Sequence, residues 1–272
     1  MRRITLPLVI LASVVIAALL AWLALSMASF GDRRPRAESP AQRAQSLATQ
    51  TLPPFKRLDV SGTAEIMLVQ GTAESVAIPS PARHQDRIEA VVRGDTLYVE
   101  AGDSSRWWNL FLGGGARNAQ IVVTFKDLES IAAAGTVKLV ATEIKVPDLR
   151  IAGAGGTSVR IDNLQTGQLR LSGAGALKAE LAGRVTEQTV TISGAGEYRG
   201  AKLVSQNATV TVAGAGQVVI HAVKTLNATI SGAGSVDYIG DPKVTERVSG
   251  AGRVRRRDAA EQAKFRIAAI AE

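Results

Sequence analysis

Cysteine is absent from the 272-residue chain, and aromatic residues make up only 4% of it. Without cysteine the protein forms no disulfide, carries no thiol for lipid attachment and performs no cysteine-based redox or metal chemistry. Histidine is scarce as well, because His84 and His221 are the only two and lie in different segments without a carboxylate cluster beside them. Surface or hydrogen-bonded histidines are more common than a metal pair in such a setting. We therefore predict no metal site and no cofactor.

Basic residues are in excess, but they are concentrated at the two ends of the chain. The net charge is +8, of which residues 1–36 carry +4 and residues 253–272 carry +3, so the body between them carries only +1. A nucleic-acid groove needs clustered lysine and arginine with stacking aromatic side chains. We predict no nucleic-acid partner, and the basic ends suit a membrane neighbour better.

One long apolar run lies near the N-terminus, at residues 4–25, which hold no charged side chain. As a helix it would extend about 33 Å, enough to cross a bilayer core of about 30 Å. It is longer than the apolar region of a typical signal peptide, which favours an uncleaved anchor. Ser26-Met27-Ala28 is nevertheless an acceptable cleavage site, so residues 1–30 are predicted to form a transmembrane signal anchor or a signal-peptide helix.

The next segment, residues 31–54, contains four prolines among arginine, glutamine, serine and alanine, and is predicted to be a flexible linker. Residues 55–257 are predicted to form one domain. Residues 258–272 have weak helical periodicity and are predicted to be a C-terminal tail or cap.

A short glycine-rich triplet recurs seven times in the predicted domain. The triplets are Ala133-Ala134-Gly135, Gly153-Ala154-Gly155, Gly173-Ala174-Gly175, Gly194-Ala195-Gly196, Gly214-Ala215-Gly216, Gly232-Ala233-Gly234 and Gly250-Ala251-Gly252. Their spacing of 18 to 21 residues predicts a stacked repeat with about one coil for each triplet.

Apolar residues alternate with polar ones around each triplet. Leu169, Leu171, Gly173, Gly175 and Leu177 therefore fall on one face of an extended strand, which predicts that both glycines of a triplet point inward. A glycine that recurs at an inward position indicates close approach of two backbones or a corner with positive φ. The pattern predicts an all-β, parallel β-solenoid with structural glycines in each coil.

Two pairs of segments resemble a known family. The stretches SGAGSVDYIGDPKV at residues 231–244 and VSGAGRV at residues 248–254 resemble the C-terminal signature of the head GIN domain family. The stretches FKRLDVSGTAEIMLVQG at residues 55–71 and VRGDTLYV at residues 92–99 resemble its N-terminal part. This family, named after a putative autotransporter adhesin head, has no assigned biochemical function. The resemblance covers about residues 55–255 and implies a right-handed parallel β-solenoid in the bacterial cell envelope.

Two motifs allow more than one interpretation. Trp107, Trp108, Leu110, Phe111 and Leu112 interrupt a polar stretch, and we predict that they form a lid over one end of the solenoid or, alternatively, a contact loop. Arg93-Gly94-Asp95 spells an integrin-binding tripeptide, but Gly-Asp between two apolar alternations is typical of a hairpin turn.

A carbohydrate-active enzyme is the alternative, because polysaccharide lyases and hydrolases occur among parallel solenoids. The position after each triplet is occupied by Thr136, Gly156, Ala176, Glu197, Gln217, Ser235 and Arg253. Only one of these residues is acidic, so no catalytic residues are predicted; a groove holding three or more carboxylates or basic groups would favour this alternative.

The sequence thus predicts a non-catalytic binding, adhesion or structural module. It would be anchored in the inner membrane and face the periplasm, or be periplasmic after cleavage, with an unidentified envelope protein or glycan as its partner.

Overall fold

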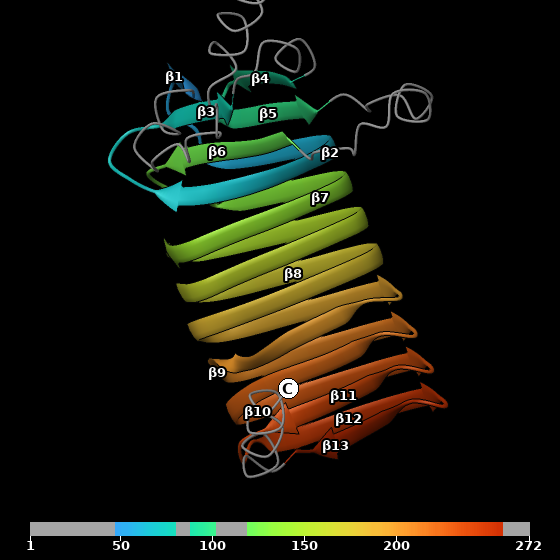
Figure 1. The fold of residues 1–272 in the computed structure, drawn as a ribbon. Helices are drawn as coiled ribbons and strands as arrows, with labels where there is room; N and C mark the ends of the chain where they lie inside the picture. The colour runs from blue at the N-terminus through green and yellow to red at the C-terminus, as the bar shows by residue number, and fades with distance from the viewer. Residues whose placement is uncertain (1–46, 80–87, 102–118, 258–272) are drawn as a thin grey trace, which may run out of the picture. The chain divides into compact units, whose positions relative to one another are not determined.

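The computed structural model describes residues 47–79, 88–101 and 119–257 (Figure 1). Its contacts divide the chain into residues 1–45 and 46–272, and every described residue belongs to the second unit. The strands are β1 (Leu47–Thr51), β2 (Arg57–Gln70), β3 (Ser75–Pro79), β4 (Ile88–Arg93), β5 (Thr96–Ala101), β6 (Ala119–Phe125), β7 (Ser130–Lys145), β8 (Asp148–Gly194), β9 (Glu197–Gly214), β10 (Gln217–Gly232), β11 (Ser235–Ile239), β12 (Lys243–Gly250) and β13 (Arg253–Arg256). None of the described residues forms a helix long and apolar enough to cross a membrane. Residues 4–25 lie outside the described ranges, so the helix expected there stays a prediction.

The strands form one sheet that winds into a parallel solenoid of about six turns, where seven coils were expected. β2, β7, β8, β9 and β10 pair in parallel and in chain order, and β11 to β13 continue the stack (Figure 1). β8 spans 47 residues because strand pairing continues through the corners of successive coils. The predicted all-β parallel solenoid is confirmed.

The core consists of columns of apolar side chains, one contributed by each coil. Ile192, Val212 and Ile230 are aligned by the register of β8, β9 and β10, and each is 0% exposed. This stacking explains the apolar alternation of the sequence, since every inward position must fit between the same positions of the coils above and below.

The glycines of a triplet have two different positions, so the prediction that both point inward is wrong for one of them. Gly155 and Gly175 have φ of 92° and 99°, and an added Cβ on either would lie within 3.0 Å of a carbonyl oxygen of the preceding coil. These are corner glycines. Gly153 and Gly173 instead point inward, where an added Cβ would meet the side chains of Thr157 and Leu177.

The order of the two kinds of glycine reverses along the chain. In the triplets that contain Gly155 and Gly175 the corner glycine is third, whereas from Gly194 onward it is first. One column of corner glycines therefore runs through Gly62, Gly135, Gly155, Gly175, Gly194, Gly214, Gly232 and Gly250. The inward glycines of the later triplets are Gly196, Gly216, Gly234 and Gly252, whose added Cβ atoms would meet Ile192, Val212 or Ile230.

Additional strands cover β2 at the N-terminal end of the stack. β5 pairs with the first half of β2 and β6 with the second half, while β4, β3 and β1 add antiparallel strands beyond them. β5 ends at Ala101 beside Gly62, and β6 begins at Ala119 beside Ala64. The segment that holds Trp107, Trp108, Leu110, Phe111 and Leu112 connects these two positions and lies outside the described residues, so lid and contact loop both stay predictions.

The other end of the described solenoid is a coil formed by β12 and β13. Val248 aligns with the buried Ile230 but is 42% exposed, because no described strand pairs with the far side of β12. Glu246 aligns with the buried Ala228 and places a charge at an inward position. Inward-pointing charges at sheet edges disfavour uncontrolled strand addition.

Candidate functional site

A β-bulge in β9 interrupts the otherwise regular stack. Glu180 pairs with Arg199 and Ala182 with Lys202, so β9 has one residue more than β8 over this interval. On its other side the pairing moves from Gly200 to Val204 while β10 advances by one residue. Bulges bend a strand and redirect its side chains, and they are common beside binding sites.

A groove of about 400 Å³ lies beside this bulge and crosses several coils. Its charged lining residues are Arg160, Asp162, Glu180, Glu197, Arg199, Lys202, Asp237 and Arg257. They come from neighbouring outward-facing positions of β8, β9 and β11 and from the residue after β13. The groove thus combines four carboxylates with four basic groups on a rigid wall.

Arg160 connects the charged side chains of the groove that lie on β8. Its Nε donates a hydrogen bond to Oδ1 of Asp162 at 3.0 Å, and its Nη1 lies 4.0 Å from Oε2 of Glu180 in the next coil. All three side chains keep 43% to 56% of their surface exposed. They are therefore positioned by one another but remain accessible to a ligand.

A second ion pair lies on β9, one coil further along. Nε of Arg199 donates a hydrogen bond to Oε1 of Glu197 at 2.6 Å. This is the only side-chain hydrogen bond of Arg199 with the described residues, so its Nη1 and Nη2 groups keep their donors. A guanidinium in this state can still bind a carboxylate or phosphate through two donors.

The end of the groove is built around Asp237, whose side chain is only 11% exposed. Arg255 Nε donates to its Oδ1 at 3.3 Å and Arg257 Nη2 donates to its Oδ2 at 3.0 Å. Two arginines on one carboxylate leave this end of the groove with an excess of positive charge. Asp237 therefore fixes the two guanidinium groups in place rather than repelling an anion.

The floor of the groove includes Tyr198, which is completely buried. The side-chain amide of Gln188 donates a hydrogen bond to its hydroxyl. Burial raises the pKa of Tyr198 well above its usual value, so its hydroxyl stays neutral and packs as part of the core.

The four carboxylates meet the criterion that would favour the carbohydrate-active alternative, but their arrangement does not support it. Each of the four forms an ion pair with an arginine, so all four position guanidinium groups in the groove. Among the described residues, moreover, no group of three histidine, cysteine, aspartate or glutamate side chains could hold a metal ion.

The residues that directly follow each triplet do not align in one column of the stack, so comparing them did not reveal this groove. Glu197 aligns with Lys178, and Ala176 belongs to another column, since the corner glycine changes place between Gly175 and Gly194. The sequence of residues 200–203 contains no motif that distinguishes the bulge from a regular strand. The available signal was the charge of Arg160 and Glu180, four positions after Gly156 and Ala176, and of Arg199, two positions after Glu197.

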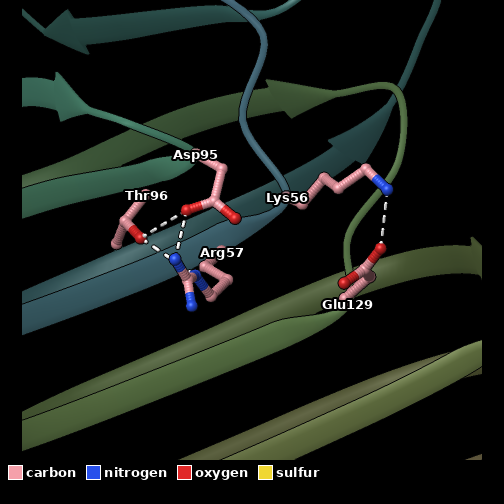
Figure 2. Close-up of polar contacts among 5 residues, drawn as sticks. All are labelled: Lys56, Arg57, Asp95, Thr96 and Glu129. Atoms are coloured by element: carbon pink, nitrogen blue, oxygen red, sulfur yellow. Dashed lines mark hydrogen bonds and ion pairs between the residues drawn. The ribbon is translucent and has the colours of Figure 1, made fainter.

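The integrin-like tripeptide occupies the turn between β4 and β5. Arg93 pairs with Thr96, so Gly94 and Asp95 form a two-residue hairpin turn, and Gly94 has φ of 64°. Arg57 holds the carboxylate of Asp95 in an ion pair and donates through Nε to the Thr96 hydroxyl at 3.1 Å (Figure 2). The turn reading of this motif is confirmed.

Asp95 therefore joins the hairpin to β2 (Figure 2). The hydrogen bond from Arg57 holds the pKa of Asp95 below its ordinary value of 3.8. A neighbouring ion pair connects Lys56 Nζ with Glu129 Oε1 at 2.7 Å and raises the pKa of Lys56. Both pairs tie the N-terminal strands to the first full coil.

Solved bacterial structures share this fold. One described as a putative adhesin from Bacteroides fragilis is 20% identical, with a TM-score of 0.68 over 79% of this chain and 98% of that chain. A putative adhesin from Parabacteroides merdae is 19% identical, with a TM-score of 0.61 over 78% of this chain and 96% of that chain. A protein described as a putative lipid binding protein from Parabacteroides distasonis is 19% identical, with a TM-score of 0.60 and the same coverage. At these identities the likeness shows the fold alone.

No curated protein matches the chain. The model of one protein family does match, over residues 54–242, which is more than half of the chain. That family is described as "Putative auto-transporter adhesin, head GIN domain", and this agrees with the resemblance carried by the glycine-rich signature. The chain belongs to the head GIN domain family.

Proposed function

We propose that this protein is a non-catalytic, envelope-anchored binding module that holds its partner in the charged groove beside the β9 bulge. The adhesin name of the family and the adhesin names of its structural neighbours support a binding or adhesion role. In this proposal residues 4–25 supply the anchor and residues 31–46 form the linker, because residues 47–51 of the expected linker belong to the sheet as β1.

The observation that carries this proposal is the way the groove is built. Arg160 and Arg199 are each fixed through Nε by a carboxylate, yet both side chains stay at least half exposed. A preorganised charged group loses little freedom when a ligand binds, so it contributes to affinity and specificity. The parallel stack beneath keeps the spacing between coils constant.

Capture of cell-envelope fragments by the immobilised full-length protein tests the proposal. The double variant Arg160→Gln, Arg199→Gln should lower the affinity by roughly tenfold or more, equivalent to about 1.4 kcal/mol. Arg150→Gln with Arg170→Gln is the matched control, because it also removes two exposed arginines but lies outside the groove.

The control variant should bind within about twofold of the unchanged protein, since long-range attraction is mostly screened at physiological ionic strength. Equal losses in the two double variants would show that net charge rather than the groove drives capture. Unchanged capture by the groove variant would show that another surface makes the contact.

A further inference from the structure

We infer that the ligand of this groove is an acidic saccharide, a polymer that carries both carboxylate groups and free hydroxyl groups. This inference rests on the proposed binding function and specifies the chemistry of its ligand. It follows from the donors and acceptors that the groove presents, from their order along the stack and from the charge at one end.

The donors favour an anionic group on the ligand. Arg160 and Arg199 donate to their carboxylate partners through Nε. Arg199 thus keeps both Nη groups for a ligand, and Arg160 keeps at least Nη2, because its Nη1 is 4.0 Å from Glu180. Paired guanidinium donors match the two oxygens of a carboxylate.

The acceptors favour hydroxyl groups on the same ligand. Asp162, Glu180 and Glu197 are 36% to 50% exposed, and each carboxylate has more acceptor sites than its arginine fills. A hydroxyl group can donate to these oxygens, whereas a second anion beside them is repelled. Polyphosphate and DNA carry anionic groups but no free hydroxyl groups along the chain, so they offer these three carboxylates no donor and are disfavoured.

The order of the charges suits an extended chain. Arg160, Glu180 and Arg199 come from three successive coils, and Glu180 is paired with Arg199 in the register. With about 4.8 Å between coils, the two arginines are separated by roughly 10 Å along the stack. A polymer lying across the coils can therefore place an acidic group at each arginine and hydroxyl groups between them.

Basic residues at the end of the groove add a further attraction. Arg257 lines this end, and Arg253 and Arg255 align with the groove residues Ser235 and Asp237. Asp237 is the carboxylate paired with Arg255 and Arg257. Lys202 lies on the bulge and forms no ion pair within the described part of the chain. This excess of positive charge favours the approach of an acidic ligand.

Binding of four defined polymers to the full-length protein in detergent micelles tests the inference. Polygalacturonate carries carboxylates and hydroxyls, polyglutamate carries carboxylates alone, dextran carries hydroxyls alone, and polyphosphate carries a different anion. At physiological ionic strength we expect polygalacturonate to bind at least about tenfold more tightly than each of the other three.

Three variants assign that binding to the groove. Arg160→Gln with Arg199→Gln should weaken polygalacturonate binding about tenfold or more, and Lys202→Gln should weaken it about threefold without disturbing an ion pair between described residues. Arg150→Gln with Arg170→Gln should leave it within about twofold. Melting temperatures measured on the same samples show whether each variant is folded.

The outcomes separate this inference from the proposed function. Equal binding of polyglutamate or polyphosphate would overturn the saccharide assignment, and so would loss of binding in the control variant. If polygalacturonate does not bind while the groove variant still loses capture of envelope fragments, the ligand class is wrong and the binding groove stands. If neither assay responds to the groove variant, both proposals fail.

Discussion

The side-chain amide of Gln188 donates a hydrogen bond to the hydroxyl of Tyr198 in the solenoid core, beneath the charged groove. Gln188 is 1% exposed and Tyr198 is 0% exposed. Gly200 makes room for the ring, because an added Cβ there would lie 2.5 Å from Cε1 of Tyr198. The pair therefore links the core to the bulged segment of β9 that forms the groove.

Tyr198→Phe should destabilise the protein because it leaves the buried amide of Gln188 without its acceptor. An unpaired buried polar group costs about 1–3 kcal/mol. Thermal unfolding should show the loss, and adding Gln188→Leu should recover part of it, since the polar group is then removed as well. Tyr98→Phe is the control at a tyrosine that is 43% exposed. A double variant less stable than Tyr198→Phe would argue against the pairing.

The corner glycines should tolerate substitution poorly. Gly194→Ala combines φ of 123° with an added Cβ 2.8 Å from the carbonyl oxygen of Gly175, so we expect a loss of about 1–3 kcal/mol in the free energy of unfolding. Gly94→Ala should cost less, because its φ is also positive but an added Cβ meets no atom within 4 Å. Ala195→Ser, at an exposed position, should be nearly neutral. Equal shifts of melting temperature in all three variants would contradict the assignment of a corner.

The ion pair between Arg57 and Asp95 should make the free energy of unfolding depend on pH in the acidic range. The pKa of Asp95 is lower in the folded state than its ordinary value of 3.8. The ion pair therefore stabilises the folded state above this ordinary value, and the stabilisation is lost as the pH falls through the lower pKa of the folded state. Asp95→Asn should therefore lower the melting temperature slightly at neutral pH, with the difference narrowing on acidification. Asp148→Asn is the control, because it removes an exposed charge of β8 that forms no ion pair with a described residue. A difference that grows as pH falls would contradict the sign.

The N-terminal apolar segment should keep the protein in the membrane. Residues 4–25 hold no charge, so high-salt washing, which screens the basic flanks, should not release the chain. Fractionation followed by N-terminal sequencing decides this point. A soluble mature protein that begins near Ser29 would identify a cleaved signal peptide instead.

The tryptophan segment should act as a lid. Changing Trp107 and Trp108 to Ser should then lower the melting temperature, because buried aromatic side chains contribute a large apolar area. In the lid interpretation, stability falls before binding is affected. Unchanged stability together with solvent-like tryptophan emission would favour the contact loop.

Much of the fold follows from local pattern. The alternation of Val190, Ile192, Val210 and Val212 with polar residues assigns inward and outward positions, because side chains alternate along any strand. The regular spacing of the glycine triplets predicts that the coils stack, and the resemblance of these triplets to a known signature identifies the family. These properties depend on residues close together in the sequence.

The charged groove and the order of the glycines depend on how each coil packs on the one before it. Gly-Ala-Gly reads the same in either order, yet Gly175 and Gly194 are both corner glycines although one is third and the other first in its triplet. The regular register places Arg160, Glu180 and Arg199 side by side, and the bulge at residues 200–203 then pairs Lys202 with Ala182 in the same groove. The sequence by itself determined which apolar side chains face inward. Only the tertiary structure decided which outward residues become neighbours and which glycine forms each corner, because the register between coils is set by backbone contacts between residues about twenty positions apart.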